Sequence, residues 1–130
     1  MKYVFPAIFT KEDAGYSIRF PDIEGCYTSA ETISEGLDMA GDVLNLMLMD
    51  MEDRNVSVPP PSDMSSVSCD KDEFVTLISA DTLEYRKMYG SQSFKKTLSV
   101  PAWLNTLAEK QDINFSYTLQ KALKEELNIV

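Results

Sequence analysis

The first residues of the chain alternate between hydrophobic runs and turn-forming residues. Residues 2–9 and 16–20 are rich in aromatic and β-branched side chains, and the sequence Glu-Asp-Ala-Gly at 12–15 separates them. This pattern predicts a β-hairpin. A turn containing proline and glycine follows, and then a short strand is predicted at 26–28.

Hydrophobic residues next recur at steps of three and four, which is the period of an amphipathic helix. Thr28 or Ser29 can cap this helix, which we expect to begin near Glu31 and to end near Arg54. Its predicted hydrophobic face consists of Ile33, Leu37, Ala40, Val43, Leu44, Met47, Leu48 and Met51. Its predicted solvent face consists of Glu35, Asp38, Asp42, Asn45 and Glu52. We therefore expect the helix to pack on a sheet through one face only.

The middle of the chain predicts one more strand and one more helix. Three prolines at 59–61 force an extended connector, and the alternating residues 73–80 predict a strand. Asp81 is the natural cap of a short helix that Gly90 ends. The order β-β-β-α-β-α indicates an α+β layer with a sheet of three or four strands.

After a polar hinge, the C-terminal residues predict a strand at 94–100 and helices at 101–110 and 114–127, the last one capped by its asparagine. Fewer than 40 residues cannot close a hydrophobic core alone, so we expect this segment to dock or to dimerise. The sequence thus predicts two domains, 1–90 and 91–130.

Charge is distributed unevenly between these two domains. The whole chain has a net charge of −9, but residues 1–90 carry 7 Lys/Arg against 17 Asp/Glu, whereas residues 91–130 carry 5 against 4. Binding to phosphate needs Lys and Arg, which argues against nucleic acid as the partner of the first domain. An acidic domain suits a basic protein partner, and the second domain can still approach DNA.

Composition argues against most enzyme classes. The chain has no histidine, no Gly-rich phosphate loop and no GxSxG turn, so we predict no catalytic residue, no metal site and no cofactor. Cys26 and Cys69 stand far apart, which indicates reduced thiols rather than a disulfide framework. No apolar run is long enough for a membrane span and no signal peptide is evident, so we expect a cytoplasmic protein.

Two segments resemble known families. The sequence Phe-Pro-Asp-Ile-Glu-Gly-Cys-Tyr-Thr at 20–28, the long helix and Val-Pro-Pro-Pro-Ser at 58–62 resemble the N-terminal domain of HicB antitoxins over roughly residues 1–80. That family usually has a glycine two residues after the threonine, where this chain has Ala30. The resemblance implies a partial RNase H-like fold without an active site, which covers the catalytic face of HicA, a small mRNA-degrading RNase toxin.

The segment 95–127 is similar to ribbon-helix-helix repressors, in which a strand and two helices (β-α-α) form a homodimer that binds DNA. This resemblance implies binding to operator DNA and autorepression of the operon. Because the segment carries few cations, we expect weak binding to each half-site and cooperative assembly of several dimers. Alternation along the strand places Lys95, Thr97 and Ser99 toward the major groove. The N–H groups of Asn114, Phe115 and Ser116 are predicted to hold a phosphate. The predicted dimer core is Leu98, Val100, Trp103, Leu107, Leu119 and Leu123.

The predicted toxin-binding surface of the first domain is acidic. Its candidate residues are Asp22, Glu24, Glu31, Glu35 and Asp38, with Asp42 nearby. Carboxylates of this kind steer a basic partner, while apolar anchors supply affinity. The alternative is a stand-alone ribbon-helix-helix repressor whose acidic domain senses a ligand or oligomerises. A neighbouring gene for a small basic protein would favour the antitoxin.

Overall fold

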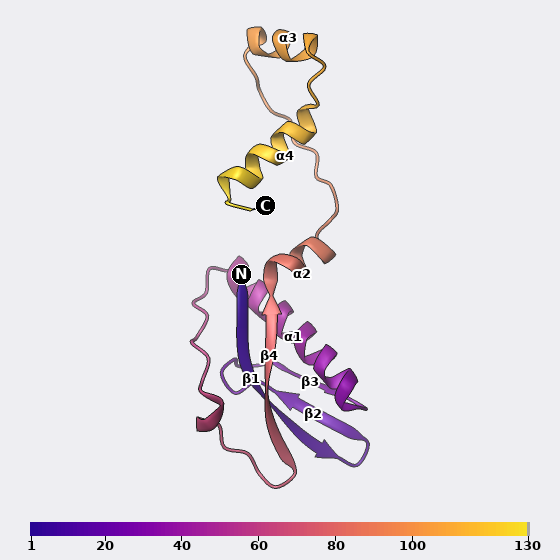
Figure 1. Ribbon diagram of the computed structural model, residues 1–130, viewed down its shortest axis with the longest axis vertical. Helices are drawn as coiled ribbons and strands as arrows, with labels where there is room; N and C mark the ends of the chain where they lie inside the picture. The colour runs from indigo at the N-terminus through magenta and orange to yellow at the C-terminus, as the bar shows by residue number, and fades with distance from the viewer. Residues whose placement is uncertain (130) are drawn as a thin grey trace. The chain divides into compact units, whose positions relative to one another are not determined.

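The computed structural model describes residues 1–129 and divides the chain into two compact units (Figure 1). We call Met1–Gln92 the body and Ser93–Val130 the tail. The predicted α+β class is confirmed, because the structure contains a four-stranded antiparallel sheet and four α-helices.

The sheet of the body has the strand order β3-β2-β1-β4, and every neighbouring pair is antiparallel. Its strands are β1 (Lys2–Glu12), β2 (Gly15–Arg19), β3 (Tyr27–Ala30) and β4 (Glu73–Asp81). The predicted hairpin joins β1 to β2. Gly15 in its turn has φ +138°, and a Cβ there would lie 2.3 Å from the carbonyl oxygen of Ala30. Only glycine fits this approach of β3 to the hairpin.

The long helix α1 (Ile33–Asp53) begins two residues later than the sequence predicts. Its cap is Thr32, whose Oγ1 accepts a hydrogen bond from the N–H of Glu35 at 3.1 Å. The predicted caps Thr28 and Ser29 are wrong. Both belong to β3, because pairing with β2 continues as far as Ala30.

The core of the body lies between α1 and one face of the sheet. Phe5, Ala7 and Phe9 alternate along β1 and belong to this core, whereas Pro6 and Ile8 between them are buried on the other face of the strand. The Phe9 ring stacks on Phe74 of β4 with centroids 4.9 Å apart. The helix meets them through a line of residues spaced by four: Gly36, Ala40, Leu44 and Leu48.

The predicted burial of Ile33 and Leu37 is wrong, since these side chains are 45% and 44% exposed. In the first turns of α1 the sheet is contacted through Gly36 and Ala40 instead. A Cβ on Gly36 would lie only 2.8 Å from Cε2 of Phe9. The small residues therefore bring the helix close to the sheet and leave their larger neighbours uncovered.

The body ends with α2 (Thr82–Tyr89), and here the predicted signals are confirmed. The Asp81 carboxylate accepts from the N–H of Glu84 at 3.3 Å, and Gly90 is the C-cap. A short 3-10 helix, η1 (Met64–Ser66), interrupts the connector between α1 and β4 and was not predicted.

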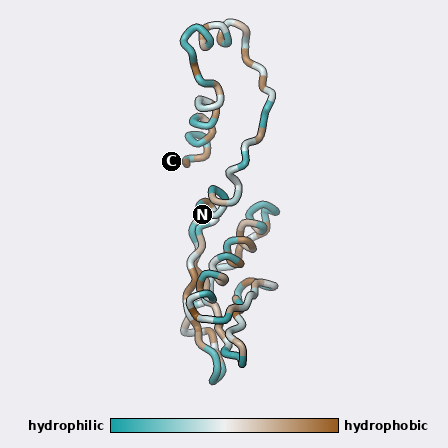
Figure 2. The backbone as a smooth tube through the Cα atoms, turned by 90° about the vertical axis from the view of Figure 1, so that its right-hand side faces the viewer, coloured by the Kyte–Doolittle hydropathy of each residue, from teal (hydrophilic) through white to brown (hydrophobic). Residues whose placement is uncertain are grey.

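The tail contains the two predicted helices, α3 (Ala102–Lys110) and α4 (Phe115–Glu126). The predicted cap is confirmed, because the Asn114 side chain accepts from the N–H of Tyr117 at 3.0 Å. Figure 2 shows hydrophilic and hydrophobic residues mixed along both helices. Within the described part of the tail, neither helix buries a residue.

The predicted strand at 94–100 is not formed in the single chain. Residues 91–101 belong to no helix or strand, and no described segment pairs with them. A strand exists only through hydrogen bonds to a neighbour. The ribbon expected here requires a second chain, so it stays a prediction.

Candidate functional site

A row of carboxylates, which we call the acidic stripe, follows the outer surface of α1 from the residue before its cap: Glu31, Glu35, Asp38 and Asp42. Glu35, Asp38 and Asp42 lie on one side of the helix at steps of three and four, and all four residues are exposed. Glu35 also helps to start the helix, since its Oε2 accepts from the N–H of Glu31 at 3.4 Å. The structure therefore brings together three of the five predicted toxin-binding residues, with Asp42 next to them.

Exposed apolar side chains border the acidic stripe. Met39 lies one turn after Glu35, and Leu46 lies one turn after Asp42. Both are exposed, Leu46 by half of its surface. Tyr85 of α2 reaches the stripe and donates to Asp42 Oδ1 at 3.3 Å. This combination of carboxylates and uncovered apolar groups is suited to a basic protein partner.

The other two predicted toxin-binding residues lie elsewhere, in the turn after β2. Asp22 accepts from the backbone N–H of Ser62 at 2.9 Å, and from the Ser62 hydroxyl. Its carboxylate thus ties the turn to the proline-rich connector. Glu24 is exposed and makes no polar side-chain contact within the described residues. Only Glu24 of this pair is available to a partner without breaking an internal contact.

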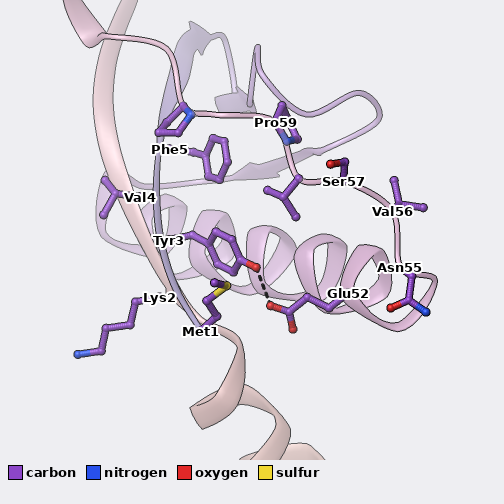
Figure 3. A pocket seen from close by; sticks show the side chains of 12 residues that line it. Met1, Lys2, Tyr3, Val4, Phe5, Glu52, Asn55, Val56, Ser57 and Pro59 are labelled. Atoms are coloured by element: carbon purple, nitrogen blue, oxygen red, sulfur yellow. Dashed lines mark hydrogen bonds between the residues drawn. The ribbon is translucent and has the colours of Figure 1, made fainter.

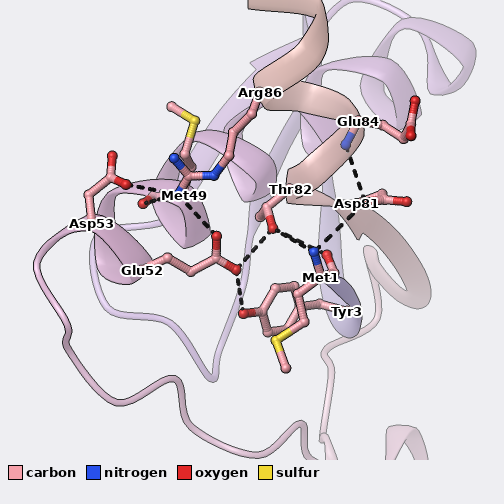
Figure 4. Close-up of polar contacts among 9 residues, drawn as sticks. All are labelled: Met1, Tyr3, Met49, Glu52, Asp53, Asp81, Thr82, Glu84 and Arg86. Atoms are coloured by element: carbon pink, nitrogen blue, oxygen red, sulfur yellow. Dashed lines mark hydrogen bonds and ion pairs between the residues drawn. The ribbon is translucent and has the colours of Figure 1, made fainter. Parts of the chain in front are cut away.

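Sequence reasoning missed a polar cluster at the end of α1, shown in Figure 4. Glu52, predicted to face solvent, accepts through Oε2 from the Tyr3 hydroxyl at 2.7 Å and from the Thr82 hydroxyl at 2.9 Å. Its Oε1 accepts from Arg86 at 3.1 Å, and Arg86 also pairs with Asp53 at 2.8 Å. These partners come from β1 and α2, 30 to 49 residues away in sequence, so no local pattern could reveal them.

The contacts within this cluster shift the pKa values of Tyr3 and Glu52. Burial raises the pKa of Tyr3, as does its hydrogen bond to Glu52, to about 12. Burial also opposes the charge of Glu52, but the hydrogen bonds from Tyr3, Thr82 and Arg86 hold its pKa below the usual value. Both oxygens of this carboxylate accept hydrogen bonds, so the cluster fastens α2 and β1 to the end of α1.

A metal site, a reactive cysteine or a membrane-spanning helix among the described residues would indicate a further function. Among residues 1–129, no three His, Cys, Asp or Glu side chains are grouped as a metal site requires. Burial raises the pKa of the Cys26 thiol to about 11, which makes it an unreactive core group. None of the helices described is long and apolar enough to cross a membrane.

In the tail, a hollow of about 670 Å³ lies between the extended segment and α4. Its apolar lining includes Leu98, Val100, Phe115, Leu119 and Ala122. The structure thus gathers three predicted dimer-core residues, whereas Trp103, Leu107 and Leu123 lie outside the hollow and are exposed.

The predicted DNA-binding residues of the extended segment do not line this hollow. Lys96 lines the hollow, together with Leu98 and Val100, which alternate with it. Lys95, Thr97 and Ser99 are exposed and do not line the hollow. Ser116 borders the hollow at the start of α4, next to Asn114 and Phe115.

Comparisons with known proteins agree on one family. A family model described as "HicB_like antitoxin of bacterial toxin-antitoxin system" matches residues 5–104. A chain of the solved "Toxin-Antitoxin complex from Streptococcus pneumoniae" is 31% identical, with 97% of this chain and 99% of that chain covered and a TM-score of 0.63. No curated protein matches the sequence.

Two further solved structures are more distant and support the fold alone. The antitoxin HicB of Burkholderia pseudomallei is 19% identical, covering 96% of this chain and 98% of its own, with a TM-score of 0.55. A chain of the "HicA3 and HicB3 toxin-antitoxin complex" is 20% identical, covering 61% of this chain and 99% of its own, with a TM-score of 0.52. From the family match and the 31% identical relative together, the chain belongs to the HicB-like antitoxins of bacterial toxin-antitoxin systems.

Proposed function

We propose that this antitoxin neutralises a small basic RNase toxin of the HicA kind through its body, as a non-catalytic inhibitor. The family supports this proposal, and so do the similar structures, which are toxin-antitoxin complexes, one of HicA3 with HicB3. We also propose that the predicted first domain, 1–90, has a partial RNase H-like layout and that 91–130 forms the second domain.

One observation carries the proposal: the acidic stripe lies beside exposed apolar side chains on the outer surface of α1. The body has a net charge of −10, which attracts a basic partner over distance. Met39 and Leu46 supply the apolar contact that gives such complexes their affinity. A toxin docked here would have its cationic RNA-binding surface covered by carboxylates.

The test measures binding to the small basic protein encoded beside this gene. We expect the double variant Glu31→Lys/Asp38→Lys to slow association by at least tenfold at low salt, and to release the RNase activity of the toxin. The control Asp70→Lys/Asp72→Lys changes the net charge equally at exposed positions outside α1, in the connector before β4. Equal association rates for the two double variants would contradict docking on the stripe.

We further propose that the tail forms a ribbon-helix-helix homodimer. Its helices bury nothing within one chain, although they carry large apolar residues such as Trp103, which is 66% exposed. In a dimer the paired strands would close over the hollow beside α4, which Leu98 and Val100 already line in the single chain. The shared core would then also contain Leu107, Leu119 and Leu123.

In this dimer Lys95, Thr97 and Ser99 would face the major groove, which admits a two-stranded ribbon. The N–H groups at Asn114, Phe115 and Ser116 would hold a phosphate at the start of α4. The dimer would thereby repress its own operon, and several dimers can assemble on one operator.

Binding to the upstream DNA tests this second function. We expect Lys95→Ala/Thr97→Ala to abolish specific binding while the dimer persists, and binding by the unaltered protein to weaken steeply with salt. Lys96→Ala is the matched control, because Lys96 lies on the other side of the strand. Salt-insensitive binding, or equal loss in the control, would contradict the ribbon. If the protein binds this DNA but no neighbouring gene encodes a small basic protein, the stand-alone repressor is favoured instead.

A further inference from the structure

The N-terminal half of β1 has a neighbouring strand on one side only. β4 pairs with β1 from Lys2 to Thr10, whereas β2 pairs with it only from Ile8 to Glu12. The connector 55–61 runs past the unpaired side. Between the two lies a groove of about 760 Å³, seen from close by in Figure 3.

The direction of the backbone groups along β1 follows from two hydrogen bonds. The N–H of Thr82 donates to the carbonyl of Met1 at 3.0 Å, and the N–H of Lys11 donates to the carbonyl of Asp72 at 2.9 Å. Both bonds belong to the register of β1 with β4, so the odd-numbered residues of β1 bond toward β4. The even-numbered residues therefore direct their N–H and C=O groups to the opposite side.

On that opposite side, Lys2 and Val4 direct their backbone groups into the groove. Among the described residues, no hydrogen bond joins either of them to the connector 55–61. The next residue of the same parity is Pro6, which has no N–H to offer. The open stretch is thus a strand position that the sheet leaves empty, bounded by a proline.

The walls of the groove are apolar near this open backbone. Val4 is 48% exposed and Val56 is 41% exposed, and Val58 and Pro59 are half-buried on the connector. Figure 3 shows Tyr3 and Phe5 of β1 directed toward the connector, with the Glu52 carboxylate beside Tyr3, whereas Val4 lies on the other side of the strand. An added strand would gain backbone hydrogen bonds and apolar contact together.

We propose that this groove accepts an extended segment of the basic toxin, about five residues long, as an additional strand beside Lys2 and Val4. This inference rests on the proposed antitoxin function and names a second point of attachment for the same partner. Charge selects the occupant: the body carries −10, so a second copy of the body is repelled and a cationic protein is attracted. Five residues match the open stretch from Lys2 to Pro6 at about 3.3 Å each.

The first test removes the hydrogen-bond donor of Val4. In full-length protein, Val4→Pro deletes an N–H that makes no bond to β4, as Pro6 already does two residues later. We expect the affinity for the small basic protein encoded beside this gene to fall roughly tenfold, since a strand carbonyl loses its partner. Val4→Thr is the control, because it keeps the N–H and the β-branched shape, and it should bind as the unaltered protein does.

Two measurements keep the proposal falsifiable if Val4→Pro does not fold. In the unaltered protein, hydrogen exchange at the Val4 amide should slow at least tenfold when the toxin binds. Ser57 lines the groove and is exposed, so Ser57→Lys should weaken toxin binding more than Ser57→Glu. Suppose that the toxin binds, that hydrogen exchange at the Val4 amide is unchanged and that Ser57→Lys and Ser57→Glu have equal affinities. These results would overturn the proposal of a toxin strand in the groove and leave the antitoxin function intact. Failure of the unaltered protein to bind the toxin at all would overturn both.

Discussion

The body and the tail carry similar amphipathic helices, yet only the body builds a core. In the body, α1 lies on a sheet whose covered face buries Phe5, Ala7 and Phe9. In the tail, α3 and α4 have no second layer within their own chain, and their large side chains are exposed. An amphipathic pattern therefore predicts that a face will be buried, but not whether the covering layer comes from the same chain.

The two regions also differ in charge, and this difference indicates different partners. The body has a net charge of −10 and the tail of +1. A stable acidic body can meet a basic protein as a preformed surface, with little cost of ordering. If the tail dimerises as we propose, it gains a core only on assembly, so its stability should depend on protein concentration.

The largest expected effect is the loss of a core side chain from the body. Phe9 is fully buried and stacked on Phe74, so Phe9→Ala should lower the free energy of unfolding of the body by about 3–5 kcal/mol. Denaturant unfolding followed at several protein concentrations measures this. The loss should be the same at each concentration, and a strongly concentration-dependent loss would mean that the body, too, needs a partner for its core.

A smaller effect is expected for a leucine of the tail. Leu107 is 53% exposed in the single chain. Leu107→Ala should weaken dimerisation by about thirtyfold, which corresponds to about 2 kcal/mol, because the side chain is covered only in the dimer. Sedimentation equilibrium measures it. Leu46→Ala, an equally exposed leucine of α1, is the control, and an equal effect there would refute the contrast between tail and body.

Local signals predicted the α-helices of both regions. Asp81 and Asn114 cap α2 and α4 as expected, and Gly90 ends α2, because a cap is a contact between residues close in sequence. The start of α1 was misplaced, since Thr28 and Ser29 are equally good caps that pairing with β2 draws into β3. The choice between cap and strand was made by a contact that the local sequence does not contain.

The candidate sites were harder to predict for the same reason. The acidic stripe could be anticipated because helical spacing groups its carboxylates. Asp22 could not be distinguished from them, although its contact with Ser62 spans 40 residues and commits it to the fold. The groove beside β1 exists because β2 is shorter than β1, and no residue pattern marks that difference.

Gly36 and Gly41 of α1 differ in how closely they approach the core of the body. Sequence alone treats Gly36 and Gly41 alike, but a Cβ on Gly36 would meet the Phe9 ring at 2.8 Å, whereas a Cβ on Gly41 meets nothing within 4 Å. Gly36→Ala should destabilise the body by about 1–2 kcal/mol through overpacking. Gly41→Ala should stabilise it by up to about 1 kcal/mol through helix propensity. Thermal unfolding of the pair measures both, and a shift of the same sign would contradict the close approach at Gly36.

The smallest effect concerns an ionic contact on the sheet of the body, which has no counterpart in the tail among the described residues. Glu73 accepts from Arg19 at 2.8 Å, from Thr10 at 2.7 Å and from the N–H of Asp70 at 2.9 Å. The hydrogen bond from Arg19, followed by those from Asp70 and Thr10, lowers the pKa of Glu73 from 4.5 to about 2.

A carboxyl whose pKa is lower in the folded state stabilises that state above its unfolded pKa, and the stabilisation disappears as the pH falls through the folded value. The difference in melting temperature between the unaltered protein and Glu73→Gln should therefore be constant above about pH 5 and should shrink toward zero as the pH falls to about 2. Glu24→Gln, at an exposed position without such contacts, should melt like the unaltered protein throughout. A Glu73→Gln difference that persists undiminished at pH 2 would show that the side-chain shape, and not the charge, joins β4 to β1 and β2 here.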